Sequence, residues 1–128
     1  MIGYVTVGTN DLERAIAFYD PLLAELGIKK MWATERRAAW GDPRVQALLV
    51  TKPYDGQAAV PGNGAMVAFL ASGPDLVGKV HAKAVALGAK DEGAPGFRGS
   101  DTDDPRFYGA YFRDLDGNKF AVFCMTAK

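Results

Sequence analysis

The chain has 128 residues, 48% of them apolar and 23% charged, which is typical of one compact globular domain, or of two small modules that share a core, and excludes wholesale disorder. Its 15 basic side chains balance its 15 acidic ones without a Lys/Arg-rich run, so the composition gives no indication of a nucleic-acid partner. No apolar stretch approaches the roughly 20 residues of a membrane helix, and the first residues lack the pattern of a signal peptide. The single cysteine excludes an internal disulfide and indicates a reduced, cytoplasmic location.

The beginning of the chain has the pattern of a strand followed by a helix. Ile2–Val7 is rich in β-branched and aromatic residues, which favours a strand. Asn10-Asp11 provides a helix N-cap, apolar residues recur at helical spacing over Leu12–Leu26, and Gly27 is a natural stop. Pro21 leaves two alternatives, which are one kinked helix or a second short helix with this proline at its first position.

Strands and turns complete the first half. Lys29–Trp40 predicts one or two strands, with a turn near Glu35-Arg36-Arg37. Gly41-Asp42-Pro43 is a turn, and Val45–Thr51 is a strand that is apolar on both faces. Lys52–Gly64 is rich in proline and glycine, and it is the best candidate for a linker in this chain.

The second half repeats this order. A helix begins at Pro74-Asp75 and stops at Gly88, and Lys90–Pro105, rich in Gly, Pro and Asp, predicts a loop, with room for one short strand. Asp116-Gly117-Asn118 is a strong hairpin signal. Three segments have the pattern of strands: Ala65–Ala71, Phe107–Arg113 and Lys119–Met125. The halves therefore both read β-α-β-β-β over about 60 residues, which predicts an α+β fold made by internal duplication.

Two blocks of the sequence carry a resemblance to a known family. One is Tyr4–Tyr19, which contains Asp-Leu-Glu-Arg and Phe-Tyr, and the other is Tyr108–Lys119, which contains Asp-x-Asp-Gly-Asn-Lys. Together with Leu26-Gly27, Leu87-Gly88-Ala89 and Ala94–Arg98 they span essentially the whole chain. In these residues the chain resembles the glyoxalase/bleomycin-resistance/dioxygenase family, also called the vicinal oxygen chelate superfamily. The motifs are specific for the fold and not for the reaction.

The resemblance implies a single domain over residues 1–128, built of two paired βαβββ modules whose mixed sheets curl around a cup. Module one would cover about residues 1–56, the linker 53–64 and module two 65–128. The resemblance also implies a homodimer. In metal-using members of this family, residues on the first and last strands of each module hold a divalent cation.

Carried over position by position, the implied metal ligands are Tyr4, Gln46, Met66 and Ala121. Catalytic divalent metals need about three donors such as imidazole or carboxylate. Alanine offers no donor, the thioether of methionine suits other metals, and tyrosine is a poor ligand at its ordinary pKa of about 10. Only Gln46 is a conventional ligand, so we expect no metal cofactor.

Alternation along the strands predicts which residues face the cup. If Tyr4 faces the cup, Val5 and Val7 pack on a helix. The expected lining is Tyr4, Gln46, Leu48, Met66, Ala68 and Phe123. Such a lining is typical of an apolar small-molecule pocket, and the alternative is a filled core without a ligand.

Five further side chains are candidates for a role. Arg98 follows a Gly-rich loop and is expected either to hold an anionic group of a ligand or to form a surface or intersubunit salt bridge. Of Tyr108 and Tyr111, three residues apart, at most one can line the cup. His81, the only histidine, is expected to be solvated on the outer side of a helix, and Cys124 to be a buried, inert thiol facing the helices.

The sequence therefore predicts a metal-independent binder of a small molecule in an apolar cup, acting by sequestration or as a sensor. A second reading is a lyase, isomerase or dioxygenase-type enzyme, similar to lactoylglutathione lyases, with a relocated metal or with Tyr4 as an acid-base group. A third is a structural remnant whose cup is filled. The expected partners are a second copy of the chain and a small molecule, with no nucleic acid and no membrane.

Overall fold

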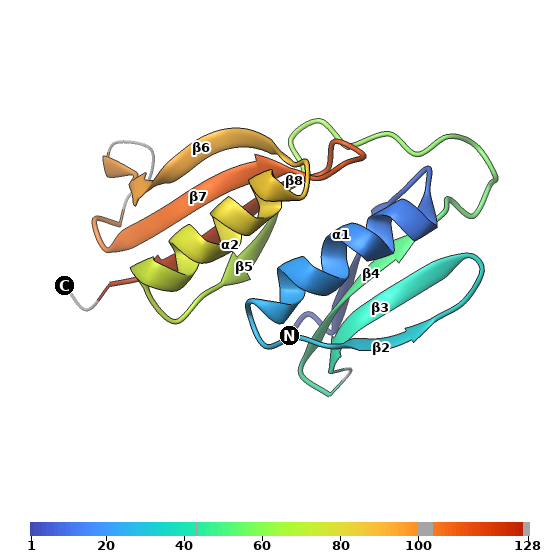
Figure 1. Ribbon diagram of the computed structural model, residues 1–128, viewed down its shortest axis with the longest axis horizontal. Helices are drawn as coiled ribbons and strands as arrows, with labels where there is room; N and C mark the ends of the chain where they lie inside the picture. The colour runs from blue at the N-terminus through green and yellow to red at the C-terminus, as the bar shows by residue number, and fades with distance from the viewer. Residues whose placement is uncertain (43, 100–103, 127–128) are drawn as a thin grey trace.

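The computed structural model describes residues 1–42, 44–99 and 104–126, and they form an α+β fold of two four-stranded mixed sheets with one helix each, as expected (Figure 1). The first sheet has the order β1-β4-β3-β2, and its strands are β1 (Tyr4–Gly8), β2 (Lys30–Ala33), β3 (Arg37–Asp42) and β4 (Gln46–Thr51). The second has the order β5-β8-β7-β6, and its strands are β5 (Val67–Leu70), β6 (Lys90–Phe97), β7 (Phe107–Arg113) and β8 (Lys119–Met125).

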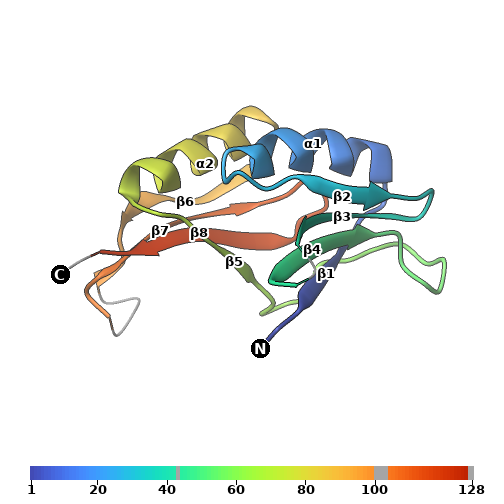
Figure 2. The ribbon, with the colours of Figure 1, turned by 90° about the horizontal axis from the view of Figure 1, so that it is seen from below.

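Both sheets have the same topology, because β1 lies parallel to β4 and β5 lies parallel to β8, while the other pairs are antiparallel. The helices α1 (Leu12–Ala24) and α2 (Pro74–Ala86) lie on the same side of the two sheets and leave the opposite side without helices (Figure 2). Among the described residues, no helix is both long enough and apolar enough to cross a membrane.

The first helix begins and ends where the sequence indicates. The Asp11 carboxylate accepts a hydrogen bond from the backbone N–H of Arg14 at 3.1 Å, which satisfies one free donor at the helix start. Pro21 lies inside one continuous helix, so the second short helix does not form. Gly27, with a φ of 73°, ends the helix in the left-handed conformation that glycine adopts without strain.

The segment expected to be a loop with room for one short strand contains a longer strand, because Lys90–Phe97 forms the eight-residue strand β6. This strand is the edge of its sheet, and its pairing with β7 shifts register between Asp91 and Gly93 and again between Gly93 and Gly96. Edge strands tolerate proline and glycine at such irregularities, so the composition that suggested a loop is compatible with a strand here. Residues 100–103 of the same predicted loop lie outside the described residues.

The core lies between the helices and the sheets, as the alternation along the strands predicts. Val5 and Val7 pack against it from β1, and Cys124 is buried in it. The largest fully buried side chains come from both modules: Trp40, Tyr19, Phe18, Phe112 and Phe120. One continuous core therefore joins the two modules.

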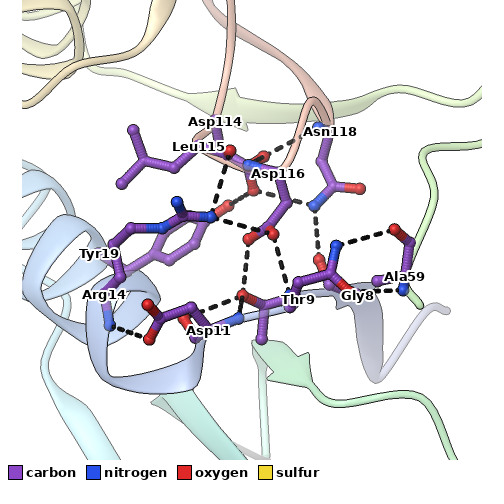
Figure 3. Close-up of polar contacts among 11 residues, drawn as sticks. Gly8, Thr9, Asp11, Arg14, Tyr19, Ala59, Asp114, Leu115, Asp116 and Asn118 are labelled. Carbon is purple, nitrogen blue, oxygen red and sulfur yellow. Dashed lines mark hydrogen bonds and ion pairs between the residues drawn. The ribbon is translucent and has the colours of Figure 1, made fainter. Parts of the chain in front are cut away.

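A polar network also joins the modules, and it is centred on the turn between β7 and β8 (Figure 3). The Asp116 carboxylate accepts hydrogen bonds from the Thr9 hydroxyl at 2.6 Å and from the backbone N–H of Asn10 at 2.9 Å. The Asn118 amide donates to the backbone oxygen of Gly8 at 2.9 Å. The Asp-x-Asp-Gly-Asn motif thus connects the last hairpin of module two to the start of α1.

The Asp114 side chain is the buried part of this network. It accepts a hydrogen bond from the Tyr19 hydroxyl of α1 and from the backbone N–H groups of Asp116 and Asn118, at 2.9 and 2.8 Å. Burial, and then the charge of Asp114, raise the pKa of Tyr19 well above its ordinary value. The tyrosine therefore stays protonated and acts as a donor.

Candidate functional site

A cavity of about 410 Å³ lies where the two modules meet. Its walls come from β1, β4 and β5 and from the end of α1. β1 and β5 are edge strands of separate sheets and do not pair with each other, so a gap remains between them. Most of the lining is apolar, and the polar side chains at the wall include Tyr4 and Gln46. This size and this lining are usual for a small-molecule site.

The structure brings three of the five predicted ligand contacts together in this cavity, namely Tyr4, Gln46 and Met66. Arg98 lines a neighbouring open groove, and Met66 lines both that groove and the cavity. Phe123 lines neither of them, and its ring stacks on Phe107 with 5.3 Å between the ring centroids. The predicted contacts therefore divide between a cavity and an adjoining groove.

Gln46 and Leu48 of β4 both line the cavity as predicted, but Leu48 does not share the face of the sheet that carries Tyr4. Leu48 pairs with Val5 and Trp40, and it is buried in the core rather than in a cup on the open face of the sheet. Gln46 is two residues before Leu48 on β4, so the two side chains point to the same face of the sheet. Gln46 pairs with Asp42 and therefore reaches the cavity from the face that the helices cover.

The error has a physical cause in the two hairpins. Residues 43–45 connect the paired residues Asp42 and Gln46, whereas residues 114–118 connect Arg113 and Lys119. The turns differ in length, so matching them residue by residue shifts the register of the following strand, and a shift of one residue reverses every side chain. Ala47 is the residue of β4 that pairs with Tyr4.

The positions that correspond to the family's metal ligands do not fit a divalent cation. Tyr4 is 64% exposed, and Ala121 is buried between Ala68 and Tyr111 of the neighbouring strands with no donor atom on its side chain. Within residues 1–42, 44–99 and 104–126, no group of three or more His, Cys, Asp or Glu side chains is placed to hold a metal ion. The residues present therefore lack the hard donors that such an ion needs.

The histidine prediction was wrong, whereas the cysteine prediction is confirmed. His81 is only 8% exposed, because α2 packs it against β6, and its Nε2 lies 3.0 Å from Oδ1 of Asp91. The backbone N–H of Gly93, followed by this contact with His81, lowers the pKa of Asp91. Cys124 lies in the core, and burial raises the pKa of its thiol, which disfavours the reactive thiolate.

The groove beside the cavity gathers charged and aromatic side chains. Arg98 Cζ lies 5.1 Å from the centroid of the Tyr111 ring, and Lys119 Nζ lies 5.6 Å from it. Glu92 pairs with Arg113 at 3.1 Å, and this hydrogen bond is the main cause that lowers the pKa of Glu92. As predicted for this tyrosine pair, Tyr111 lines the groove while Tyr108 packs against the core.

Sequence reasoning missed Lys119 as a residue of this site. It stands at the end of the Asp-x-Asp-Gly-Asn-Lys motif, which was interpreted only as a signature of the fold. Its pairing opposite Arg113 at the start of β8 puts it beside Glu92 and Tyr111. The sequence signal that would have indicated it is alternation, because Lys119, Ala121 and Phe123 are spaced by two along β8 and therefore share one face of the sheet.

Comparisons with known proteins identify the group to which this architecture belongs. The family model of the Glyoxalase/Bleomycin resistance protein/Dioxygenase superfamily matches residues 1–122. A glyoxalase/bleomycin resistance protein from Albidiferax ferrireducens T118 is 39% identical, with a TM-score of 0.86, over 97% of this chain and 98% of that one. The comparison with curated proteins finds no significant match.

More distant solved structures share the fold. A glyoxalase/bleomycin resistance protein/dioxygenase family enzyme from Burkholderia phytofirmans PsJN is 18% identical, with a TM-score of 0.74, over 96% of this chain and 97% of that one. A glyoxalase-related enzyme from Fulvimarina pelagi is 18% identical, with a TM-score of 0.71, over 97% of this chain and 87% of that one.

Proposed function

This chain belongs to the glyoxalase/bleomycin resistance protein/dioxygenase superfamily, and from that membership we propose that it binds a small molecule in the apolar cavity between its modules, without a metal ion. The cavity is the observation that carries the proposal. Tyr4 and Gln46 supply polar groups at its wall, and the rest of the ligand would contact apolar side chains such as Met66. Binding of this kind serves sequestration or sensing.

Independence from a metal is supported by the donor chemistry of the implied ligand positions. A phenol, a thioether and a methyl group stand at Tyr4, Met66 and Ala121, and none of them is a good ligand of a divalent cation near neutral pH. The reduced, cytoplasmic location expected from the single cysteine is part of the same proposal.

Ala68→Trp should weaken the binding of a neutral apolar probe, N-phenyl-1-naphthylamine, which is followed by its fluorescence. Ala68 is exposed and lines the cavity, so an indole at this position projects into the space without displacing the core. We expect the dissociation constant to rise at least about tenfold, since several buried probe atoms lose their contacts. Ala33→Trp, on the exposed edge strand β2, is the matched control and should bind as the parent protein does.

The same titration tests metal independence. Probe affinity and melting temperature should be unchanged by EDTA and by nickel, zinc, manganese or ferrous iron, because a metal bound to the folded state would raise stability with its concentration. A metal content near one ion per chain, with such a rise, would favour the enzyme reading with a relocated metal. A chain that binds no probe before or after the Ala68 substitution would indicate a filled, non-functional cup.

We also propose that two copies associate through the sides of the sheets that carry no helix. Apolar side chains are exposed there, with Leu70 68% and Tyr4 64% exposed, and burying such surface stabilises association. Light scattering should give the mass of two chains. Leu70→Glu should give the mass of one, while Val85→Glu, on the exposed side of α2, should leave two. A dimer that survives Leu70→Glu would place the interface elsewhere.

A further inference from the structure

The groove beside the cavity has an excess of positive charge. Among the described residues, Lys90, Arg98, Arg113 and Lys119 stand in or next to it, and Glu92 supplies the one carboxylate that lines it. That carboxylate is already paired with Arg113 at 3.1 Å and with Lys90 at 3.6 Å. In the described part of the chain, no carboxylate forms an ion pair with Arg98 or Lys119. Within this part of the chain, Arg98 and Lys119 therefore keep charges that no ion pair neutralises, although the charge of Lys119 also acts on Glu92.

The Arg98 guanidinium is held in place before any ligand arrives. One of its Nη atoms donates a hydrogen bond to the backbone oxygen of Ala94, and its Cζ lies over the Tyr111 ring. A Cβ atom at Gly93 would approach Arg98 Nη2 to 3.2 Å, and one at Gly96 would approach Nη1 to 3.4 Å. The two glycines of β6 thus leave the space that the guanidinium occupies. Holding a cation in this way reduces the entropy lost when an anion binds.

Lys119 approaches the same aromatic ring. Its ammonium lies 5.6 Å from the Tyr111 centroid and the Arg98 guanidinium lies 5.1 Å from it. Two like charges directed at one half-buried ring repel each other, and the nearby carboxylate of Glu92 is already engaged with Arg113. An oxyanion bound by both cations would remove this repulsion and form charge-assisted hydrogen bonds.

We propose that this groove binds the oxyanion end, a carboxylate or a phosphonate-like group, of a ligand whose apolar part occupies the cavity between the modules. Met66 lines both spaces, so the cavity and the groove adjoin at its side chain. The inference rests on the proposed function and names the class of ligand as an amphipathic anion, held at one end by Arg98 and Lys119.

Three probes with the same phenyl body test this assignment by calorimetric titration: 4-phenylbutyrate, its neutral amide, and 3-phenylpropylphosphonate. We expect at least one of the anions to bind about tenfold or more tightly than the amide, the scale of one charge-assisted contact. The arm that binds more tightly distinguishes carboxylate from phosphonate. Amide resonances of Gly93, Gly96 and Tyr111 should shift in the NMR spectrum when the anion is added.

Arg98→Met and Lys119→Met should each remove most of the preference for the anion and leave the affinity for the amide unchanged. Both substitutions keep the apolar stem of the side chain, so packing is retained. Lys79→Met, on the exposed side of α2, is the matched control and should retain the full preference.

The outcomes separate the two proposals. Equal affinity for acid and amide, or a preference that survives both substitutions, would overturn the anion site and leave the apolar cavity as the ligand site. If neither these probes nor N-phenyl-1-naphthylamine bind, both the anion site and the proposed function are overturned.

Discussion

Asp114→Ala is expected to lower the free energy of unfolding by about 3 kcal/mol or more, as the buried carboxylate accepts several hydrogen bonds, each worth about 1.5–3 kcal/mol when the acceptor is charged. The substitution leaves the Tyr19 hydroxyl and two backbone N–H groups, those of Asp116 and Asn118, without their acceptor. Urea denaturation measures the loss. Asp114→Asn, which keeps the shape and one acceptor oxygen, should cost less.

Asp55→Ala is the matched control for this prediction. Asp55 also accepts a backbone hydrogen bond, from Gln57 at 2.9 Å, but it lies exposed in the segment between the modules. Its replacement should change stability by no more than about 0.5 kcal/mol. Equal losses at the two positions would show that the network contributes no more than an isolated surface turn.

The raised pKa of Tyr19 should make the stability of the folded protein depend on pH in the alkaline range. Its pKa in the folded protein is raised, first by burial and then by the charge of Asp114. Above about pH 10 the unfolded chain loses this phenolic proton while the folded chain retains it, so unfolding releases a proton and stability falls as the pH rises. Below that pH both states are protonated and the effect vanishes. Tyr19→Phe should reduce the alkaline slope of a stability–pH profile.

Gly41→Ala is expected to be the most damaging single methyl addition in module one. Gly41 has a φ of 116°, and a Cβ atom there would lie 2.5 Å from the backbone oxygen of Gln46. Neither the backbone conformation nor the contact can be relieved by rotating a side chain, so the β3–β4 hairpin must shift. We expect a loss of about 2–4 kcal/mol in thermal or urea unfolding. Probe affinity should fall as well, because both residues line the cavity.

Gly78→Ala provides the opposite expectation from the same chemical change. Gly78 lies inside α2, and a Cβ atom there would meet nothing within 4 Å. The substitution should therefore stabilise the protein by about 0.5–1 kcal/mol, since alanine loses less backbone entropy than glycine in a helix. If both glycine variants were equally stable, the strain assigned to the hairpin would be absent.

The fold was predictable because its signals are local. The Asp11 cap, the left-handed stops at Gly27 and Gly88 and the Asp116-Gly117-Asn118 turn each lie at the end of the element they delimit. The order of elements and the two sequence blocks were then sufficient to indicate the family. The length of β6 was underestimated because an edge strand with two register shifts has the composition of a loop.

The site was less predictable because it depends on register and on packing between segments. Leu48 and Gln46 line the cavity as predicted, but they were assigned to the face of the sheet that carries Tyr4, since the two hairpin turns differ in length. His81 was expected in solvent, and only the packing of α2 against β6 brings it to Asp91. Lys119 reaches Tyr111 only through the pairing of β7 with β8, so its alternation along β8 places it on a face but does not identify its neighbour.

The network between the modules has a consequence for the order in which the chain acquires its structure. Thr9 and Asp116 are separated by 107 positions, and Tyr19 and Asp114 by 95. Contacts so distant along the chain close late and slow folding. During synthesis, module one leaves the ribosome before Asp114 and Asp116 of module two have been made. The Tyr19 hydroxyl and the apolar side chains of β1 are therefore exposed until module two follows. We therefore expect the nascent first module, with this surface exposed, to be the stage of synthesis at which aggregation competes most with folding.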